Sequence, residues 1–398
     1  MRFAAAFVVA SLTLAAAACS RETLPSASLP AQTNVRHTIP ASPYQIVADL
    51  TTATGGHSVA SLTELDGKLF GTAAHGGRGW GTVFEVDPST GKVRTLHEFG
   101  PLDNRDGSVP AGGLTAIGHK LYGTTTSGGA DRAGVVFEMD PGTGNVHVLH
   151  HFDVKEGAFP EGDLLNLNGT LYGTTRGGGN DGHGSIYSIT TAGKFTSLYL
   201  FGGNHTTDGQ HPRAGLTSYN GLLYGTTWNG GDFGWGTVFQ YDPSGNNEIV
   251  VYSFDLNGVD GASPAAPLTV YLGALYGVTF GGGPKNRGIA FTLNPITGAE
   301  TILHSFTGKD GSYPDGALTG WNGELYGTTK LGGSPAHPGG TLFELNPATT
   351  AFSVIHEFGA SGDGAEPRAA LIPFGTSLYG TTYTGGTDRG GVIYKLTY

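Results

Sequence analysis

The sequence predicts an all-β protein: a seven-bladed β-propeller of four-stranded antiparallel blades, closed by its N-terminal strand. Two observations lead to this fold. Short runs of alternating apolar residues are separated by turns rich in glycine, of which the chain has 69 among 398 residues, and this pattern is typical of many short strands. A motif of the form Leu-Tyr-Gly-Thr-Thr also recurs about every fifty residues, with copies that begin at residues 69, 121, 171, 223, 275, 325 and 378.

The composition argues against a disordered chain and against a nucleic-acid-binding protein. Apolar residues make up 38% of the chain and charged residues only 13%, whereas disordered chains combine low hydrophobicity with high charge. The formal net charge of −11 argues against nucleic acid as a partner, because contact with phosphates requires a basic surface.

The first 18 residues have the features of a signal peptide. Arg2 precedes an apolar run that ends at Ala18, and the run is too short for a membrane span. The single cysteine, Cys19, follows directly and resembles the lipidated cysteine of bacterial lipoproteins; ordinary signal-peptidase cleavage after Ala18 is the alternative. Residues 19–42, rich in Ser, Thr, Ala and Pro, are expected to form a disordered tether. These features predict export. If Cys19 is lipidated, the protein is expected to be attached to the outer membrane or cell surface through the lipid alone, and if it is not, the protein is expected to be periplasmic or secreted.

The repeats begin at residue 43, and the second unit illustrates the four strands expected in each blade. Its apolar runs predict strands over 113–117, 120–126, 135–140 and 146–152. Short Gly- and Pro-containing turns follow the first and third strands, whereas longer loops join the second strand to the third and one unit to the next. Residues 43–398 are therefore expected to form one propeller domain.

A glycine stands at the centre of every second strand. Glycine normally weakens a strand, so its recurrence predicts the close approach of a neighbouring blade. The seven positions are Gly71, Gly123, Gly173, Gly225, Gly277, Gly327 and Gly380.

The two ends of the repeat region complement each other. The last unit ends at Tyr398 after only three strands, and residues 44–50 match the fourth-strand pattern of residues 95–99. We therefore expect residues 43–50 to pair with residues 391–398, so that no blade is left with an open edge.

The repeat unit resembles that of a known bacterial family. Leu-Tyr-Gly-Thr-Thr-x-x-Gly-Gly, followed by Gly-x-x-Phe and Leu-His-x-Phe, is similar to the GloVer tandem-repeat family of envelope and exported proteins, which carry various surface anchors. The resemblance covers about residues 43–398 and implies the fold and export, but no particular biochemical activity. The paired glycines give a more distant likeness to kelch repeats.

Two sets of repeated polar residues are interpreted as structural. One fourth-strand position holds His or Tyr in six units, and six loops between units carry an acidic residue before glycine. Such an acidic residue is typical of a turn cap, although calcium binding at these loops stays open. The first set is His97, His150, Tyr199, Tyr252, His304 and His356, and the second is Asp106, Glu156, Asp208, Asp260, Asp310 and Asp363.

The sequence contains no motif that indicates a metal, a cofactor or a catalytic nucleophile. The histidines lack the spacing of a zinc site, and the pair His205 and His211 offers little support for one. No phosphate-binding loop and no nucleophile elbow is present. We therefore predict no metal and no cofactor, and expect binding rather than catalysis.

Large, variable side chains are expected on the face that carries the long loops. Such variation on a repeated frame is how a scaffold carries a binding site. Three positions contribute: the start of the glycine-rich loop, the residues just before the third strand, and the residue after the loop proline. The candidates are Arg176, Trp228, Phe280, Lys330 and Tyr383 at the first position, His183 and Trp235 at the second, and Arg213 and Arg368 at the third.

The favoured interpretation is a monomeric binding module for carbohydrate or a cell-wall polymer. Aromatic faces suit sugar rings, and Arg176 and Lys330 can engage carboxylates or sulfates. Ala74 and Thr126, the small loop-start residues of the first two blades, predict an opening there. Two alternatives remain, a polysaccharide lyase or hydrolase that uses His183, Arg176 and Tyr383 on the same face, and a scaffold for protein partners.

Overall fold

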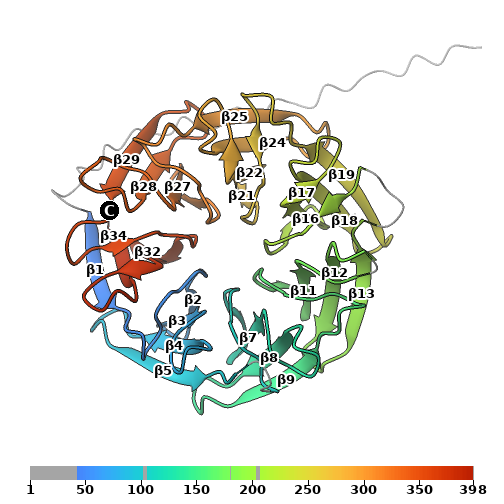
Figure 1. The fold of residues 1–398 in the computed structure, drawn as a ribbon, viewed down its shortest axis with the longest axis vertical. Coiled ribbons are helices and arrows are strands. Elements are labelled where there is room, and N and C mark those ends of the chain that lie inside the picture. Colours follow the sequence, from blue (N-terminus) through green and yellow to red (C-terminus); the bar gives the residue numbers. More distant parts are fainter. Residues whose placement is uncertain (1–42, 102–104, 180, 203–206, 398) are drawn as a thin grey trace, which may run out of the picture. The chain divides into compact units, whose positions relative to one another are not determined.

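The computed structural model describes residues 43–397 except 102–104, 180 and 203–206. Within this part of the chain the regular secondary structure is β-strand, and no helix is long and apolar enough to span a membrane. Seven four-stranded antiparallel sheets form a ring of blades (Figure 1), so the predicted seven-bladed propeller is confirmed. The predicted signal peptide, Cys19, the tether and His205 lie outside the described residues.

Blades 1 to 3 each contain four strands that pair in chain order. Blade 1 consists of β2 (Thr63–Leu65), β3 (Lys68–Ala73), β4 (Thr82–Val86) and β5 (Val93–Glu98). Blade 2 consists of β6 (Thr115–Ile117), β7 (Lys120–Thr125), β8 (Val135–Met139) and β9 (Val146–His151). Blade 3 consists of β10 (Leu165–Leu167), β11 (Thr170–Thr175), β12 (Ser185–Thr190) and β13 (Phe195–Leu200).

Blades 4 to 6 have the same internal order. Blade 4 consists of β15 (Thr217–Tyr219), β16 (Leu222–Thr227), β18 (Thr237–Asp242) and β19 (Asn247–Ser253). Blade 5 consists of β21 (Thr269–Tyr271), β22 (Ala274–Thr279), β24 (Ile289–Leu293) and β25 (Glu300–Ser305). Blade 6 consists of β26 (Thr319–Trp321), β27 (Glu324–Thr329), β28 (Thr341–Leu345) and β29 (Phe352–Glu357).

Blade 7 joins the two ends of the propeller. Its inner strands are β31 (Ile372–Phe374), β32 (Ser377–Thr381) and β34 (Val392–Thr397), and its outer strand is β1 (Tyr44–Asp49). β1 runs antiparallel to β34, with Tyr44 opposite Leu396 and Asp49 opposite Val392. The blue and red strands lie side by side in Figure 1, and the predicted ring closure is confirmed.

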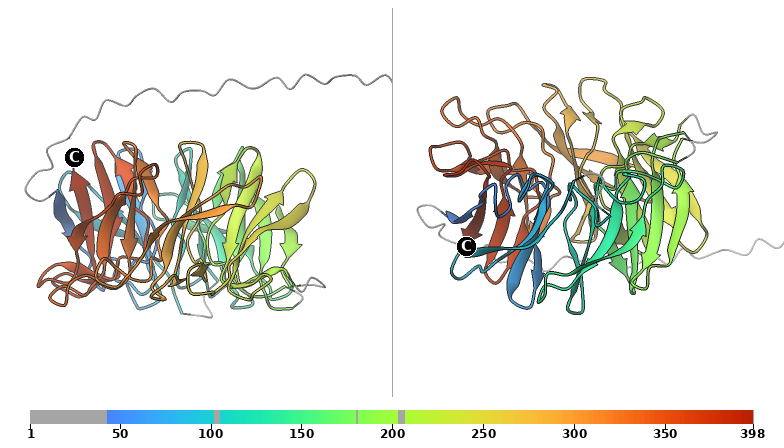
Figure 2. Two further views of the ribbon diagram at one scale, coloured as in Figure 1. Left: turned by 90° about the horizontal axis from the view of Figure 1, so that it is seen from above. Right: turned by 60° about the horizontal axis from the view of Figure 1, so that its bottom comes forward.

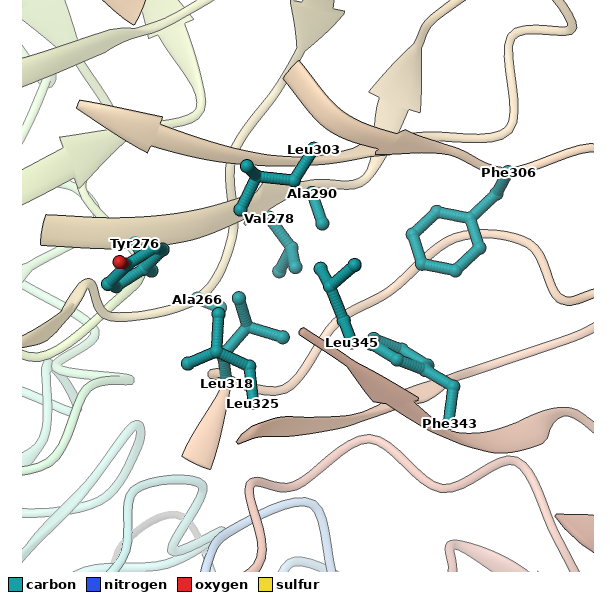
Figure 3. Packing of buried hydrophobic residues seen from close by; sticks show 10 residues of the cluster. All are labelled: Ala266, Tyr276, Val278, Ala290, Leu303, Phe306, Leu318, Leu325, Phe343 and Leu345. Carbon is teal, nitrogen blue, oxygen red and sulfur yellow. The ribbon is translucent and has the colours of Figure 1, made fainter. Parts of the chain in front are cut away.

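The hydrophobic core lies between successive blades. Figure 3 shows one cluster in which Val278 and Leu303 of blade 5 pack with Leu325, Phe343 and Leu345 of blade 6. Burying a side chain of this size contributes about 1.5 to 3 kcal/mol. Because each blade covers the apolar face of the next, the blades stabilise one another around the ring.

The glycines of the second strands have a different role from the one expected. A Cβ added to Gly327 would lie 2.4 Å from Cζ of Phe343 and 2.8 Å from Cδ2 of Leu318. Phe343 belongs to the third strand of the same blade, so the expected approach of a neighbouring blade is wrong. Every such glycine pairs across the sheet with an aromatic residue: Gly71–Phe84, Gly123–Phe137, Gly173–Tyr187, Gly225–Phe239, Gly277–Phe291, Gly327–Phe343 and Gly380–Tyr394.

The two sets of repeated polar residues meet at the outer edge of the blades. Nε2 of His97 lies 2.9 Å from Oδ2 of Asp106, and the hydroxyl of Tyr199 donates to Asp208 at 3.0 Å. The same fourth-strand-to-loop contact joins His150 to Glu156, Tyr252 to Asp260, His304 to Asp310 and His356 to Asp363. The fourth-strand residue therefore holds the middle of the loop that leads to the next blade.

The long loops gather on one face of the ring. Figure 2 shows that the strands run between two faces. Short two-residue strands tie the loop between blades to the loop between the second and third strands of the next blade. These pairs are β14 (Gly209–Gln210) with β17 (Asn229–Gly230), β20 (Gly261–Ala262) with β23 (Gly281–Gly282), and β30 (Gly364–Ala365) with β33 (Thr384–Gly385).

Candidate functional site

A repeated backbone clamp builds the loop face. Phe159 precedes the loop proline, and its N–H donates to the carbonyl of Ala133 at 2.9 Å while its own carbonyl accepts from N–H of Arg176 at 3.1 Å. Its φ of 62° lies in the left-handed region, which is costly for a bulky residue unless the surroundings impose it. The clamp thereby holds the side chain of Phe159 beside that of Arg176.

The same clamp recurs in every blade. The residue with the left-handed backbone is His57, Val109, Phe159, His211, Ser263, Tyr313 or Glu366. Its carbonyl accepts from the first residue of the glycine-rich loop, which is Ala74, Thr126, Arg176, Trp228, Phe280, Lys330 or Tyr383, respectively. The second list contains the loop-start candidates from the sequence. The first list was missed as a set, and only His211 was considered, as one of a pair of possible metal ligands. The sequence signal for this set is variability immediately before a proline that recurs in six of the seven units.

The loop-start candidates are partly exposed and form contacts between blades. The rings of Trp228 and Phe280 lie 5.3 Å apart, and Nζ of Lys330 lies 5.7 Å from the centre of the Phe280 ring. Phe280 also stacks on Tyr313 at 4.9 Å. A continuous series of aromatic rings therefore runs across blades 4 to 6 on this face.

A pocket of about 330 Å³ opens at blades 3 and 4. Its larger lining side chains are Phe159, Arg176, His211, Arg213, Trp228 and Asn229. The guanidinium of Arg176 lies 5.6 Å from the ring centre of Phe159, and that of Arg213 lies 4.9 Å from the ring of Trp228. The structure thus brings three predicted residues, Arg176, Arg213 and Trp228, into one pocket. 

One carboxylate holds both arginines. Oε1 of Glu161 lies 2.9 Å from Nε of Arg176, and Oε2 lies 2.9 Å from Nε of Arg213. Glu161 follows the loop proline, at the same repeat position as Arg213, and was not among the predicted site residues.

His211 has a defined tautomer when its ring is neutral. Its Nδ1 lies 3.0 Å from the carbonyl oxygen of Arg176, and a carbonyl can only accept, so Nδ1 carries the hydrogen. Nε2 then holds the lone pair, and no described residue hydrogen-bonds to it. His183 packs edge-on against His211 with ring centres 5.4 Å apart, but it does not line the pocket.

The other predicted residues lie apart from this pocket. Tyr383 of blade 7 contacts Arg368, whose guanidinium is 4.0 Å from its ring centre, and it also contacts His57. Trp235 is 42% exposed and stands just before β18, where its carbonyl accepts from N–H of Ser263 at 2.7 Å. His183, Arg176 and Tyr383, suggested as a catalytic group, are therefore divided between blades 3 and 7.

A second cavity, of about 270 Å³ and open to solvent, is lined by the loops that enter all seven blades. It contains the side chains of Glu161, Asp163, Arg213, Asp315 and Arg368. Burial raises the pKa of Asp163, an effect partly opposed by a hydrogen bond from the Gly113 N–H. Burial also raises the pKa of Asp315, although the charges of Arg213, Arg368 and Lys330 oppose the increase.

The described residues offer no evident metal centre. No three His, Cys, Asp or Glu side chains of this part of the chain gather in a group suited to a metal ion. The carboxylates of the Asp-Gly loops instead accept hydrogen bonds, as when Oδ1 of Asp310 accepts from N–H of Thr307 at 2.8 Å. This arrangement fits the turn-capping interpretation of those loops.

A sequence profile described as the Gloeobacter/Verrucomicrobia repeat matches residues 33–233, 203–337 and 273–398. The chain belongs to this repeat family. The resemblance drawn from the repeat unit is thereby confirmed. No curated protein matches the sequence of this Gloeobacter/Verrucomicrobia repeat protein.

Solved structures that resemble this repeat protein include two oligogalacturonate lyases. One, in complex with manganese, is 14% identical with a TM-score of 0.57, and the match covers 87% of this chain and 90% of that chain. The enzyme from Vibrio parahaemolyticus is 11% identical with a TM-score of 0.54, and the match covers 88% and 92%.

A third similar structure is the extracellular domain of a putative hybrid two-component system from B. thetaiotaomicron. It is 12% identical with a TM-score of 0.58, and the match covers 89% of this chain and 39% of that chain. At these identities the likeness concerns the fold alone.

Proposed function

We propose that the loop face of this repeat protein binds carbohydrate. The observation that carries the proposal is the pocket between Phe159 and Trp228, two aromatic rings that each support a stacked guanidinium. Aromatic rings pack against the apolar faces of sugars, and nearby polar groups orient the hydroxyls. Arg176, Arg213, His211 and Asn229 supply such polar groups around one pocket.

The neighbouring surface supports a polymer rather than a single sugar. The ring series from Trp228 through Phe280 to Tyr313 continues from the pocket across the next two blades. The first two blades carry only Ala74 and Thr126 at the loop-start position. A chain of several sugars can therefore enter over the small side chains and extend along the aromatic series.

The test is a glycan array followed by calorimetric titration of each glycan that binds. Trp228→Ala is expected to weaken binding at least tenfold, equivalent to about 1.4 kcal/mol. The matched control is Phe233→Ala, because Phe233 is an aromatic residue of the same blade that is 53% exposed outside the pocket. Binding to proteins but to no glycan would support the scaffold alternative and overturn the proposal.

A second candidate function is elimination from a uronate polymer. Nε2 of His211 would take the proton from C5, the released electron pair would form the C4–C5 double bond, and the C4–O bond would break as that oxygen leaves and acquires a proton. The specific observation in its favour is the fixed tautomer of His211 beside Arg176 and Arg213 in the pocket. These arginines would offset the charge of the uronate carboxylate.

The elimination candidate has its own measurement. Incubation with uronate polymers would produce a rise in ultraviolet absorbance from the new double bond. That rise should disappear in His211→Ala and persist in His183→Ala, since His183 does not line the pocket. No rise with any uronate polymer would leave binding as the function.

We also propose that the protein is exported and lipidated on Cys19. The support is the apolar N-terminal segment and the position of the only cysteine directly after it. Mass spectrometry of the native N-terminus should detect acyl chains on Cys19. An unmodified Cys19, or a Cys19→Ser protein that remains on the membrane, would contradict lipidation.

A further inference from the structure

We infer that the sugar taken by the pocket is anionic, a uronate or a sulfated residue; the inference rests on the proposed carbohydrate function. Arg176 and Arg213 contribute two positive charges and Glu161 one negative charge, which leaves a net charge of +1. The chain as a whole carries −11, so a cationic pocket contrasts with the rest of the protein.

The way the arginines are held leaves donors for a ligand. Glu161 engages each guanidinium through Nε, and Phe159 and Trp228 each cover a guanidinium face. Within the described chain no hydrogen bond is made by the terminal Nη atoms of either arginine, and the one such bond of these guanidiniums comes from Nε of Arg213. Both side chains line the pocket and are only partly exposed, at 44% and 38%. The two arginines therefore offer four Nη groups whose N–H bonds can be donated to a ligand in the pocket.

Guanidinium groups held in this way suit an oxyanion. A carboxylate or a sulfate accepts two parallel N–H bonds from one guanidinium, and such charge-assisted bonds are stronger than those to a neutral hydroxyl. Because Glu161 and the aromatic rings already restrict both arginines, binding requires little further loss of side-chain freedom. Glu161 lines the second cavity but not this pocket, so its negative charge does not stand between the ligand and the Nη groups.

A neutral sugar makes less use of this arrangement. Its hydroxyls can accept from the Nη groups, but they carry no charge to offset the pocket's net charge. Lys330, Arg287 and Arg368, the other cations stacked on rings of this face, lie outside the pocket lining. The selectivity for an anionic group is therefore assigned to Arg176 and Arg213.

The experiment is calorimetric titration of the full mature protein with three trisaccharides that share one backbone. They are cellotriose, the corresponding trisaccharide of glucuronic acid, and cellotriose sulfated at O6. At least one anionic form is expected to bind tenfold or more tightly than cellotriose, with an affinity that falls as salt rises. The form that binds more tightly distinguishes a carboxylate from a sulfate as the recognised group.

The variants separate this inference from the proposed function. Arg176→Gln and Arg213→Gln should each weaken the anionic ligand about tenfold and leave the affinity for cellotriose nearly unchanged, while Trp228→Ala weakens both. Arg287→Gln is the matched control, because Arg287 also stacks on an aromatic ring of this face, that of Tyr313, but lies outside the pocket. Unchanged thermal melting would show that each variant is folded.

Two results would overturn the inference. Equal affinity for cellotriose and both anionic forms, with loss only in Trp228→Ala, would retain carbohydrate binding and reject the anionic class. Failure of all three trisaccharides to bind would also reject an anionic sugar as the ligand of this pocket. The glycan array would then decide separately whether carbohydrate binding itself fails.

Discussion

Nε2 of His304 lies 3.0 Å from Oδ2 of Asp310, while Phe352 of the next blade stacks on the imidazole with ring centres 3.7 Å apart. One side chain thus connects its own loop and the neighbouring blade. Burial alone would raise the pKa of Asp310, but hydrogen bonds from His304 and Thr307 outweigh it and lower the pKa to about 2.

We predict that this contact stabilises the fold in a pH-dependent way. The pKa of Asp310 is lower in the folded chain than the value of about 3.9 for a free aspartate, so its contribution is present above pH 4 and is lost as pH falls toward 2. His304→Phe keeps a ring against Phe352 but removes the hydrogen bond. It should lower the free energy of unfolding by about 1 to 2 kcal/mol at pH 5, and by progressively less between pH 4 and pH 2.

Urea unfolding at several pH values measures this difference. Asp310→Asn, which cannot ionise, should lose the same pH-dependent part of the stability. A difference between wild type and His304→Phe that is constant from pH 5 to pH 2.5 would mean that packing, not the Asp310 contact, is responsible.

A second prediction concerns the glycine at the centre of each second strand. In Gly327→Ala the new methyl would lie 2.4 Å from Cζ of Phe343, so the ring or the strand must move. Overpacking of this kind typically costs about 1 to 3 kcal/mol, and the thermal midpoint should fall accordingly. Gly281→Ala is the control, because its methyl would meet nothing nearer than 3.4 Å; an equal loss in both variants would contradict the role of Phe343.

The repeat made the fold predictable. The blade number follows from a period near fifty residues with four strand patterns per unit, and the closure follows from the displaced fourth strand. All three features can be recognised from the amino-acid sequence alone. The partner of the strand glycines was not predictable in the same way. The glycine and its aromatic partner are set by cross-strand register, which pairs Gly71 with Phe84. The glycine pattern alone had predicted the close approach of another blade instead.

The candidate site was only partly predictable, for a physical reason. A left-handed backbone at a non-glycine residue is imposed by the clamp and is not encoded in the side chain, so residues as different as Phe159, His211 and Glu366 occupy one position. The position just before the third strand is also not marked by one residue type. The clamp uses the carbonyls of His183 and Trp235, which were predicted as site residues, but those of Ala133, Gly339 and Gly390 in blades 2, 6 and 7.

A third prediction follows from a carboxyl group in an unfavourable environment. Burial raises the pKa of Glu248 to about 8, with a further increase from the Asp208 charge and a partial decrease from the Tyr199 hydroxyl. Oε1 of Glu248 has no hydrogen-bond partner among the described residues. The folded chain therefore keeps Glu248 protonated at a pH where the unfolded chain ionises it.

The raised pKa of Glu248 predicts the direction in which Glu248→Gln changes the stability of the fold. The pKa of Glu248 is higher in the folded state than the value of about 4.3 for a free glutamate, so wild type loses stability as pH rises from 4 to about 8, and glutamine does not. The variant should be as stable as wild type at pH 4 and more stable by about 1 to 2 kcal/mol at pH 8.5, after allowance for partial solvent exposure. Thermal melting at both pH values tests this, with the exposed Glu64→Gln as control; a variant less stable at pH 8.5 would refute it.

The last prediction concerns the closure of the ring by β1. The Tyr44 ring stacks on His356 of blade 6 with centres 3.7 Å apart, and its hydroxyl donates to Oδ1 of Asp363 at 2.6 Å. Tyr44→Phe keeps the stack and loses a charge-assisted hydrogen bond, so it should lower the free energy of unfolding by about 1.5 to 3 kcal/mol. Tyr44→Ala should lower it further.

Removal of residues 1–50 tests the closure directly, because it exposes the edge of β34, whose Val392, Ile393 and Tyr394 are buried in the intact ring. An uncovered apolar edge favours association between chains, so size-exclusion chromatography should detect oligomers and the melting transition should broaden. Removal of residues 1–42 retains β1 and is the matched control. If both shortened chains remained monomeric with the same melting midpoint, β1 would not be needed to hold the propeller closed.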